Sequence, residues 1–469
     1  MKNFLDFLKT ENMSLFTDFY ELAMCASYFD NKNFEPATFD LFIRRLPENR
    51  SYFLVAGLEQ CLQYLQSIRF TDDHLAYLKT QGFKRDFLDY LSGFRFTGEV
   101  CAVPEGTLVF ANEPLIRVTA PIIEAQLVET FLLNTVNLQT MVATKASRVV
   151  YAAKGNPVIE FGLRREQGVD AGMKVARSSY IAGCQGTSNV LAWRVYGIPL
   201  FGTMAHSFVM SYSKEIDAFR AFTATFPNKS TLLIDTYDDF SGAEKAAVIA
   251  KELEAKGCRL GGVRLDSGDL AKTSRKIRKF FDAQGLSYVK IFASGDLDEY
   301  KIEELLNKGA RIDSFGVGTK MGTSADRPYL DVIYKLCETG TADGSFSPIM
   351  KLSKDKITLP GRKQVYRFED AEGDFEKDTI ALAGEKVDGE PLLVKVMEKG
   401  SLTYAFPSLQ EIRANAAENL SKLPDAYKAL TGAPAYPVEL SRNLLNLVKA
   451  LKRQLTITEI SHVSPDAAA

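Results

Sequence analysis

Cysteine and histidine are both scarce in this chain of 469 residues. Six cysteines are scattered along it, with no Cys-x-x-Cys pair, and the three histidines lie far from one another. A disulfide framework or a zinc site requires closer spacings, so this pattern argues against both. It predicts reduced thiols and a cytoplasmic location.

A charge surplus and a long apolar run are also lacking. Lys and Arg number 57, Asp and Glu number 59, and no basic block stands out. Nucleic acid and an anionic membrane surface therefore have no electrostatic support as partners. Asp6 and Lys9 interrupt the apolar N-terminal residues, which argues against a signal peptide. No stretch approaches the roughly 20 apolar residues of a membrane span, so we expect a soluble protein.

The chain does contain enough apolar sequence for a full core. Apolar residues make up 46% and charged residues 25%, as is usual for globular proteins. The length indicates about three domains. We predict an N-terminal α+β domain over 1–140, an α/β domain with the active site over 141–340, and a C-terminal region over 341–469 that packs on the N-terminal domain.

The outer regions show individual elements without a repeating unit. We predict helices at 17–29, 57–66 and 440–455, strands at 37–43 and 364–368, and short strands within 98–119 that turn signals at 104–106 and 112–114 interrupt.

The middle region alternates short apolar strands with amphipathic helices. Strands are predicted at 157–161, 184–187, 199–203, 231–234, 262–265, 289–293 and 312–316, and helices at 243–256, 270–282 and 297–308. The later strands recur at roughly 23–32 residues, the size of one βα unit. Repeated βα units imply a parallel sheet, either closed into a barrel or open and doubly wound.

Polar residues gather where these strands end. Arg164 follows the first strand, and His206 and Asp235 follow later ones. Since parallel α/β folds carry function at the C-terminal ends of their strands, we expect one site along this edge of the sheet.

Two glycine-containing loops after the last two strands are candidates for a phosphate site. They are Ser294-Gly295-Asp296 and Gly316-Val317-Gly318-Thr319. Glycine lets backbone N–H groups approach an anion closely, and a following helix N-terminus favours negative charge. The alternative is that these glycines serve only as turns.

Arg264 and Asp266 lie two residues apart, so on a strand they point to the same side. This pair suits a phosphosugar, with the guanidinium on a phosphate and the carboxylate on ribose hydroxyls or Mg²⁺. A structural ion pair is the alternative. His206, at a strand end, is a candidate nucleophile that Asp235 would orient, the alternative being a satisfied structural histidine.

Six ordered segments carry a resemblance to a known family. They read LFTDFYE from Leu15, FDLFIRR from Phe39, EFGLRR from Glu160, GTMAHS from Gly202, GVRLDSGD from Gly262, and MKLS from Met350 followed by LPG from Leu359. On these motifs the chain resembles the nicotinate phosphoribosyltransferase family over most of its length. The resemblance implies an irregular, incomplete (β/α) barrel, with an α+β domain built from the N-terminal region and the C-terminal segment packing on it.

The resemblance also implies a reaction. Nicotinate and phosphoribosyl pyrophosphate would give nicotinate mononucleotide and pyrophosphate, in NAD biosynthesis and salvage. ATP hydrolysis would be coupled to this step through phosphorylated His206, with Mg²⁺ as cofactor. The expected assembly is a homodimer with the active site at its interface.

The resemblance assigns roles to individual residues. Asp235 would orient His206, Phe161 would stack on the pyridine ring, and Tyr20 of the neighbouring subunit would cover its opposite face. The other substrate contacts would come from Arg164, Arg264, Asp266, Asp296, and, around the 5′-phosphate, Gly295, Gly316, Gly318 and Thr319. Arg45, Lys335 and Lys351 are looser candidates for pyrophosphate or ATP, since solvated surface charges are an equally good reading.

Three alternatives remain open. Related nicotinamide enzymes carry an Asp in the loop that here reads Gly186-Thr187-Ser188-Asn189, and Ser188 favours the acid because it can donate to a carboxylate. An aldolase-like barrel requires a lysine on a strand, whereas Lys320 lies beyond the glycine loop. A silent nicotinate sensor has no use for His206.

Overall fold

The computed structural model describes residues 8–341, 344–353 and 358–460. The chain forms two compact units. Met1–Met141 and Tyr329–Ala469 make up the first unit, and Val142–Pro328 make up the second. Helix α6 (Glu129–Ala152) begins in the first unit and ends in the second.

The first unit is built on a seven-stranded sheet of order β13-β12-β1-β5-β3-β17-β18. Its strands are β1 (Pro36–Ile43), β3 (Glu99–Ala102), β5 (Pro114–Pro121), β12 (Val332–Gly340), β13 (Phe346–Pro348), β17 (Val394–Glu398) and β18 (Ser401–Leu402). The three strands from the N-terminal segment thus lie at the centre, and strands from the C-terminal segment flank them on both sides: β12 pairs with β1, and β17 with β3.

Two smaller sheets complete the strands of this unit. One has the order β16-β14-β15-β19, with β14 (Lys363–Glu369), β15 (Phe375–Leu382), β16 (Glu390–Pro391) and β19 (Val438–Leu440). The other pairs β2 (Phe53–Leu54) with β4 (Leu108–Val109).

The helices of the first unit come from both chain segments. They are α1 (Phe19–Asp30), α2 (Leu58–Ser67), α3 (Asp72–Thr80), α4 (Arg85–Ser92), α5 (Ile122–Leu127), α15 (Leu409–Lys422), α16 (Asp425–Lys428) and α17 (Arg442–Leu455), with the 3₁₀ turn η2 (Thr10–Leu15) and the π-helical turn η4 (Thr456–Ile460). Asn419 and Asn415 of α15 bond the backbone of Leu108 and Glu105, which fixes the C-terminal segment on the N-terminal one.

The second unit is a six-stranded sheet whose neighbours are all parallel. The strands are β6 (Val158–Glu160), β7 (Gly186–Thr187), β8 (Thr231–Leu233), β9 (Gly262–Leu265), β10 (Lys290–Ala293) and β11 (Ser314–Val317), in the order β7-β6-β11-β10-β9-β8. Val263, Leu265 and Ile291 are fully buried, as expected for strands covered on both faces.

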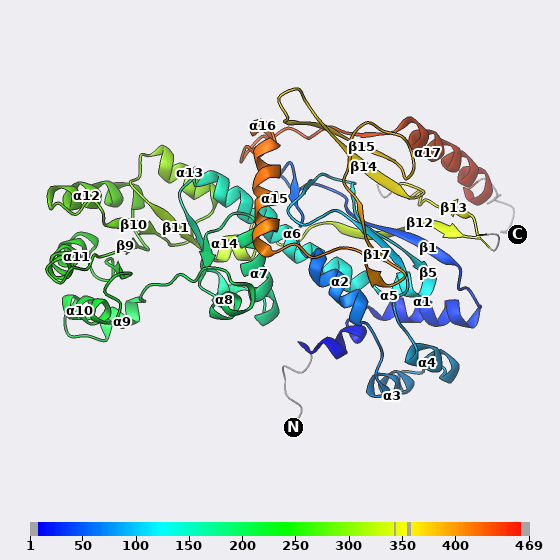
Figure 1. The fold of residues 1–469 in the computed structure, drawn as a ribbon, viewed down its shortest axis with the longest axis horizontal. Helices are drawn as coiled ribbons and strands as arrows, with labels where there is room; N and C mark the ends of the chain where they lie inside the picture. Colours follow the sequence, from blue (N-terminus) through cyan, green and yellow to red (C-terminus); the bar gives the residue numbers. More distant parts are fainter. Residues whose placement is uncertain (1–7, 342–343, 354–357, 461–469) are drawn as a thin grey trace, which may run out of the picture. The chain divides into compact units, whose positions relative to one another are not determined.

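Helices alternate with these strands along the chain. They are α7 (Val169–Ile181), α8 (Val190–Tyr196), α9 (His206–Met210), α10 (Glu215–Thr225), α11 (Asp239–Glu254), α12 (Leu270–Ala283), α13 (Glu299–Asn307) and α14 (Thr319–Gly322), with the 3₁₀ turn η3 (Leu163–Arg165). Helix α11 packs on β9 and α12 on β10 (Figure 1). The apolar face of α12, which includes Ile277 and Phe281, is buried against the sheet.

The predicted βα alternation of the middle region is confirmed, with one difference. Residues 199–203 do not form a strand. Leu200 makes only an isolated parallel bridge to Thr187 of the two-residue strand β7. Among the described residues, strand pairing does not close into a barrel: β7 and β8 stand at opposite ends of the ladder.

None of the helices in the described part of the chain combines the length and the apolar character needed to cross a membrane.

Candidate active site

The predicted site residues of the second unit lie in loops that leave the same edge of the sheet. Phe161 follows β6, Ser188 follows β7, and Asp235 follows β8. Asp266 follows β9, and Ser294 follows β10. The neighbouring strands are parallel, so all these loops emerge at the carboxyl ends of the strands, where parallel α/β sheets bind their ligands.

His206 begins helix α9 and is held by two neighbours. Its Nδ1 lies 3.1 Å from Thr236 Oγ1, and its Nε2 lies 3.8 Å from Asp266 Oδ2. The imidazole is 39% exposed, so it remains accessible from solvent. The structure therefore places His206 at the sheet edge, beside the carboxylate of Asp266.

Asp235 makes different contacts from those that the sequence predicted. Its Oδ2 accepts hydrogen bonds from the backbone N–H of Asp266 at 2.8 Å and from Ser267 Oγ at 2.7 Å. The bond to His206 Nδ1 comes instead from Thr236, the next residue along the chain. Asp235 Oδ1 is buried and has no hydrogen-bond partner among the described residues. A buried carboxylate oxygen of this kind is expected to take a ligand donor or a cation.

Arg264 and Asp266 point to the same side, as their spacing predicts. Arg264 Nη2 lies 3.5 Å from Asp266 Oδ1, and Nη1 donates to Thr203 Oγ1 at 2.7 Å. Burial lowers the pKa of Arg264, and the carboxylates of Asp266 and Asp235 partly offset this effect. Arg264 Nε is buried without a partner in the described part of the chain, so this guanidinium retains a donor for a ligand.

The loop after β10 packs directly on Asp266. Gly295 has φ +100°, and a Cβ there would come within 2.0 Å of the Asp266 carbonyl oxygen, so glycine is required. Ser294 Oγ donates to Asp266 Oδ1. The carboxylate of Asp296 forms two ion pairs, with Lys301 at 3.1 Å and with Lys320 at 3.2 Å. The predicted contact of Asp296 with ribose hydroxyls would therefore compete with two lysines.

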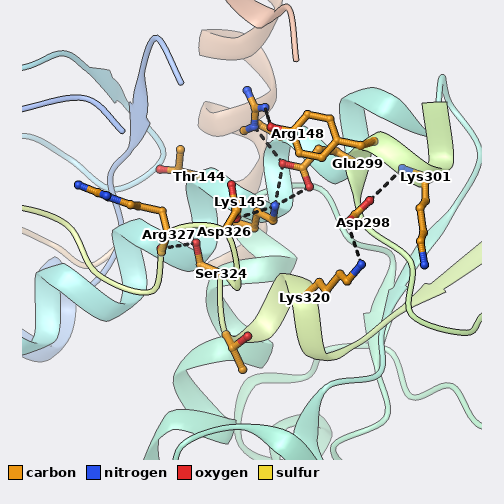
Figure 2. Close-up of polar contacts among 12 residues, drawn as sticks. Thr144, Lys145, Arg148, Asp298, Glu299, Lys301, Lys320, Ser324, Asp326 and Arg327 are labelled. Atoms are coloured by element: carbon orange, nitrogen blue, oxygen red, sulfur yellow. Dashed lines mark hydrogen bonds and ion pairs between the residues drawn. The ribbon is translucent and has the colours of Figure 1, made fainter. Parts of the chain in front are cut away.

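Ion pairs fix the elements that flank the two glycine loops (Figure 2). Asp298 caps α13 by accepting from the Lys301 N–H, and it also pairs with Lys320 of α14 at 3.1 Å. The fully buried Glu299, the first residue of α13, pairs with Lys145 at 2.6 Å and with Arg148 at 3.2 Å.

Lys145 also pairs with Asp326, at 2.8 Å. Helix α13 and the segment after α14 are thereby attached to α6, and the ends of both glycine loops are held in place.

Phe161 lies beside a second aromatic ring that the sequence analysis missed. Its ring centroid is 5.5 Å from that of Phe292, and the rings are tilted by 53°. Both rings pack against Gly316 of β11: a Cβ there would lie 2.7 Å from Phe292 Cζ and 2.9 Å from Phe161 Cδ2. Gly316 thus has a packing role in this structure. Gly318 is similarly close, since its Cβ would lie 2.8 Å from the Phe161 carbonyl oxygen, and Thr319 begins the short helix α14.

Glu160 is a second residue missed by the sequence analysis. It is fully buried at the end of β6, where it accepts from Thr187 Oγ1 at 2.5 Å and from the backbone N–H of Gly162. Its carbonyl oxygen accepts from the Ser188 N–H at 3.0 Å. Arg164 is exposed on the turn η3. An acid in the otherwise apolar strand PVIEF was the available signal, because buried carboxylates require partners.

Four candidates belong to the first unit. Tyr20 is 46% exposed on α1, and its hydroxyl bonds Glu129. Arg45 and Lys351 are exposed. Lys335 lines a cavity of ≈ 370 Å³ between β1, β12 and the sheet of β14, β15 and β19.

No group of three or more His, Cys, Asp or Glu side chains in the described ranges is arranged to hold a metal ion.

Comparison with known proteins identifies the family. Residues 15–137 match the nicotinate phosphoribosyltransferase (NAPRTase) N-terminal domain, residues 157–368 the NAPRTase family, and residues 386–448 the C-terminal domain. A nicotinate phosphoribosyltransferase of Mycobacterium tuberculosis is 46% identical over 94% of each chain. One from Bacillus subtilis is 41% identical over 93% of this chain and 94% of the relative.

Solved structures agree with this assignment. The human nicotinic acid phosphoribosyltransferase superposes with a TM-score of 0.83 and 31% identity, covering 93% of this chain and 99% of that one. A nicotinate-nucleotide pyrophosphorylase from Pyrococcus furiosus has a TM-score of 0.73 and 27% identity, covering 90% and 99%. The chain therefore belongs to the nicotinate phosphoribosyltransferase family and is an enzyme of that class.

Proposed function

We propose that this protein joins nicotinate to phosphoribosyl pyrophosphate, giving nicotinate mononucleotide and pyrophosphate, in NAD biosynthesis and salvage. The observation that carries the proposal is the placement of His206, Asp266 and Arg264 together at the carboxyl edge of the parallel sheet. The open ladder would be part of an irregular, incomplete (β/α) barrel. The scattered cysteines, without a Cys-x-x-Cys pair, suit a cytoplasmic location.

The transfer requires a bond between the pyridine nitrogen and C1 of the ribose, while the bond from C1 to the pyrophosphate oxygen breaks. Positive charge builds on the ribose and negative charge on the leaving group, so the site must hold both groups in line and stabilise the anion. Phe161 would stack on the pyridine ring, and Arg164 and Arg264 would contact the substrate or its phosphates. Asp266 and Asp296 would hold ribose hydroxyls.

The 5′-phosphate would lie against the two glycine loops, at Gly295, Gly316, Gly318 and Thr319. Lys301 and Lys320 both pair with Asp296 of the first loop, so a bound phosphate would compete with this carboxylate for the two lysines. Arg45, Lys335 and Lys351 remain candidates for pyrophosphate or ATP.

The residues present fit Mg²⁺ as a shared ion. Mg²⁺ is usually held by one or two carboxylates together with substrate phosphates. Asp235 Oδ1, buried and without a partner in the described residues, and the neighbouring Asp266 would provide those carboxylates. When bound, the cation would neutralise charge on the pyrophosphate.

ATP would be coupled to the reaction through His206. One ring nitrogen would attack the γ-phosphorus and release ADP, and the phosphoryl group would then pass to water. The second nitrogen must be held by a neighbour for this step, and Thr236 and Asp266 are the neighbours observed.

A homodimer with Tyr20 donated to the neighbouring site is part of the proposal. Helix α8 exposes Val190, Leu191, Trp193 and Val195, each more than half exposed. Large exposed apolar side chains on one short helix suit a protein–protein interface. Phe19 and Tyr20 of α1 are also exposed.

A product assay tests the proposal. The protein is incubated with nicotinate, nicotinamide or quinolinate, each with phosphoribosyl pyrophosphate and Mg²⁺, with and without ATP. Of the three pyridines, we expect only nicotinate to give a product, nicotinate mononucleotide, and we expect this product to form faster when ATP is present. Product from nicotinamide or quinolinate but not nicotinate would contradict the assignment, and no product from any of the three would favour a sensor.

A further inference from the structure

Two carboxyl groups lie side by side beneath the loop that carries Phe161 and Arg164. Glu160 is at the end of β6 and Glu166 just after η3, and a Cβ on Gly162 would meet an oxygen of each, Glu166 Oε1 at 2.5 Å and Glu160 Oε1 at 3.0 Å. Glu160 is fully buried, and both oxygens of Glu166 are inaccessible to solvent.

Three glycines from three elements surround the Glu166 carboxyl group. A Cβ on Gly162 would lie 2.5 Å from Glu166 Oε1, one on Gly322 of α14 2.7 Å from it, and one on Gly172 of α7 3.3 Å from Oε2. Glycine at these positions leaves room for the carboxyl group. The backbone of these three glycines encloses Glu166 and brings no titratable side chain to it, so Glu160 is the titratable neighbour.

This enclosure determines the protonation state. Neither oxygen of Glu166 receives an N–H or O–H donor from the described residues. Two adjacent carboxylates cannot both stay ionised in such a place, so one proton must be shared between them. Desolvation, followed by the charge of Glu160, raises the pKa of Glu166 to about 9.

The pair also holds the elements proposed to surround the pyridine. Glu160 accepts from the Gly162 N–H, next to Phe161, and from Thr187 Oγ1, next to Ser188. Thr187 Oγ1 in turn accepts from the Asn189 N–H at 2.9 Å. A shift of Glu160 would therefore move Phe161 and Ser188 together.

We propose that the proton shared by Glu160 and Glu166 positions Phe161, Arg164 and Ser188 for the pyridine substrate, which makes Glu166 a positioning residue. The inference rests on the proposed function, because it takes nicotinate as the ligand of these residues. Loss of the proton separates the two carboxylates and loosens the loop from Gly162 to Glu166.

The direction of the pH effect follows from these contacts. Glu160 on β6 is the one titratable group, within the described residues, that acts on the pKa of Glu166; Gly162, Gly172 and Gly322 contribute none. Because this pKa is raised, the proton is bound at neutral pH and lost as the pH rises through about 9. Substrate affinity falls over that range.

The experiment compares the KM for nicotinate from pH 7 to pH 10 in wild type, Glu166→Gln, Glu166→Leu and the exposed control Glu244→Gln. In the wild type and the control, KM rises about tenfold per pH unit above the pKa while kcat changes little. Glu166→Leu, which has no donor, raises KM at every pH. The amide of Glu166→Gln donates a hydrogen bond to Glu160 at every pH. The KM of this variant should therefore equal that of wild type near neutrality and should not rise with pH. A rise in Glu166→Gln equal to that of wild type overturns the proposal.

A second measurement does not depend on activity. The infrared difference spectrum of wild type minus Glu166→Gln at neutral pH should contain the carbonyl stretch of a neutral carboxylic acid, and the band should disappear near pH 9. Its absence overturns the shared proton. Failure of the proposed function would look different: wild type would not use nicotinate at all, whereas the infrared band would remain.

Discussion

The carboxylate of Asp235 and the backbone N–H of Asp266 are 2.8 Å apart, and this hydrogen bond joins the ends of β8 and β9. Ser267 Oγ donates to the same carboxylate oxygen. The hydroxyl of Thr236, the next residue along the chain, is the group that contacts His206 Nδ1. Asp235 thereby organises the backbone on which Asp266 stands, and Asp266 contacts His206 from the other side.

The first prediction concerns Thr236. Thr236→Val removes the hydroxyl that holds His206 and keeps the shape of the side chain. One hydrogen bond contributes about 1 kcal/mol, so labelling of the protein by γ-labelled ATP should slow by about five- to tenfold. His206→Ala should abolish the acid-labile label. Normal labelling of Thr236→Val, with Asp235→Asn unlabelled, would show that Asp235 orients the histidine during the reaction.

The second prediction concerns Gly316. Gly316→Ala places a Cβ less than 3 Å from the rings of Phe161 and Phe292, so one ring must move. Overpacking of this kind costs about 1–3 kcal/mol, which corresponds to a rise in the KM for nicotinate of about fivefold to a hundredfold if substrate binding bears the cost. Steady-state kinetics measure this rise. Gly93→Ala is the control, because its Cβ meets its nearest neighbour only at 3.8 Å. Equal KM values for both variants would contradict the role of Gly316.

The third prediction concerns the buried pair of Lys145 and Glu299. Lys145→Met leaves the fully buried carboxylate of Glu299 with Arg148 alone, and breaking a buried ion pair costs about 3–5 kcal/mol. Denaturant unfolding should show this loss. The exposed pair of Arg220 and Glu252 provides the comparison, and Arg220→Met should cost much less stability than Lys145→Met, because water screens an exposed pair.

A double-mutant cycle separates the pair from its surroundings. Lys145→Met combined with Glu299→Gln should recover part of the lost stability, because the buried carboxylate that lost Lys145 is then neutral. If the two single losses simply add, the pair does not stabilise the attachment of α13 to α6.

Much of the second unit was predictable because its strands are short, apolar and followed by polar residues. The i, i+2 spacing of Arg264 and Asp266 also predicted that both side chains point to the same side of the chain, which the structure confirms. These features are local in the sequence, so a single chain is enough to read them.

Contacts between distant segments were not predictable in the same way. Thr236 and Asp235 are adjacent, and which of them faces His206 depends on how each side chain leaves the end of β8. The pairing of Glu160 with Glu166 requires the turn η3 to fold back over β6, and three glycines on separate elements permit it. The ring of Phe292 meets Phe161 because β11 lies between β10 and β6 in the sheet with a glycine at the crossing point.

The fourth prediction concerns the choice between the acid and the amide. Ser188 stands at the end of β7, and its N–H bonds the carbonyl oxygen of Glu160, so its position is fixed. Ser188→Asp adds a negative charge that repels the carboxylate of nicotinate and accepts from the amide of nicotinamide. Like charges at short range cost several kcal/mol, so the ratio of kcat/KM for nicotinate over nicotinamide should fall by at least about a hundredfold. Competition assays with both pyridines measure that ratio. Ser188→Asn, which matches Asp in size without its charge, should lower the ratio much less, and an unchanged ratio in Ser188→Asp would show that Ser188 does not contact the substrate.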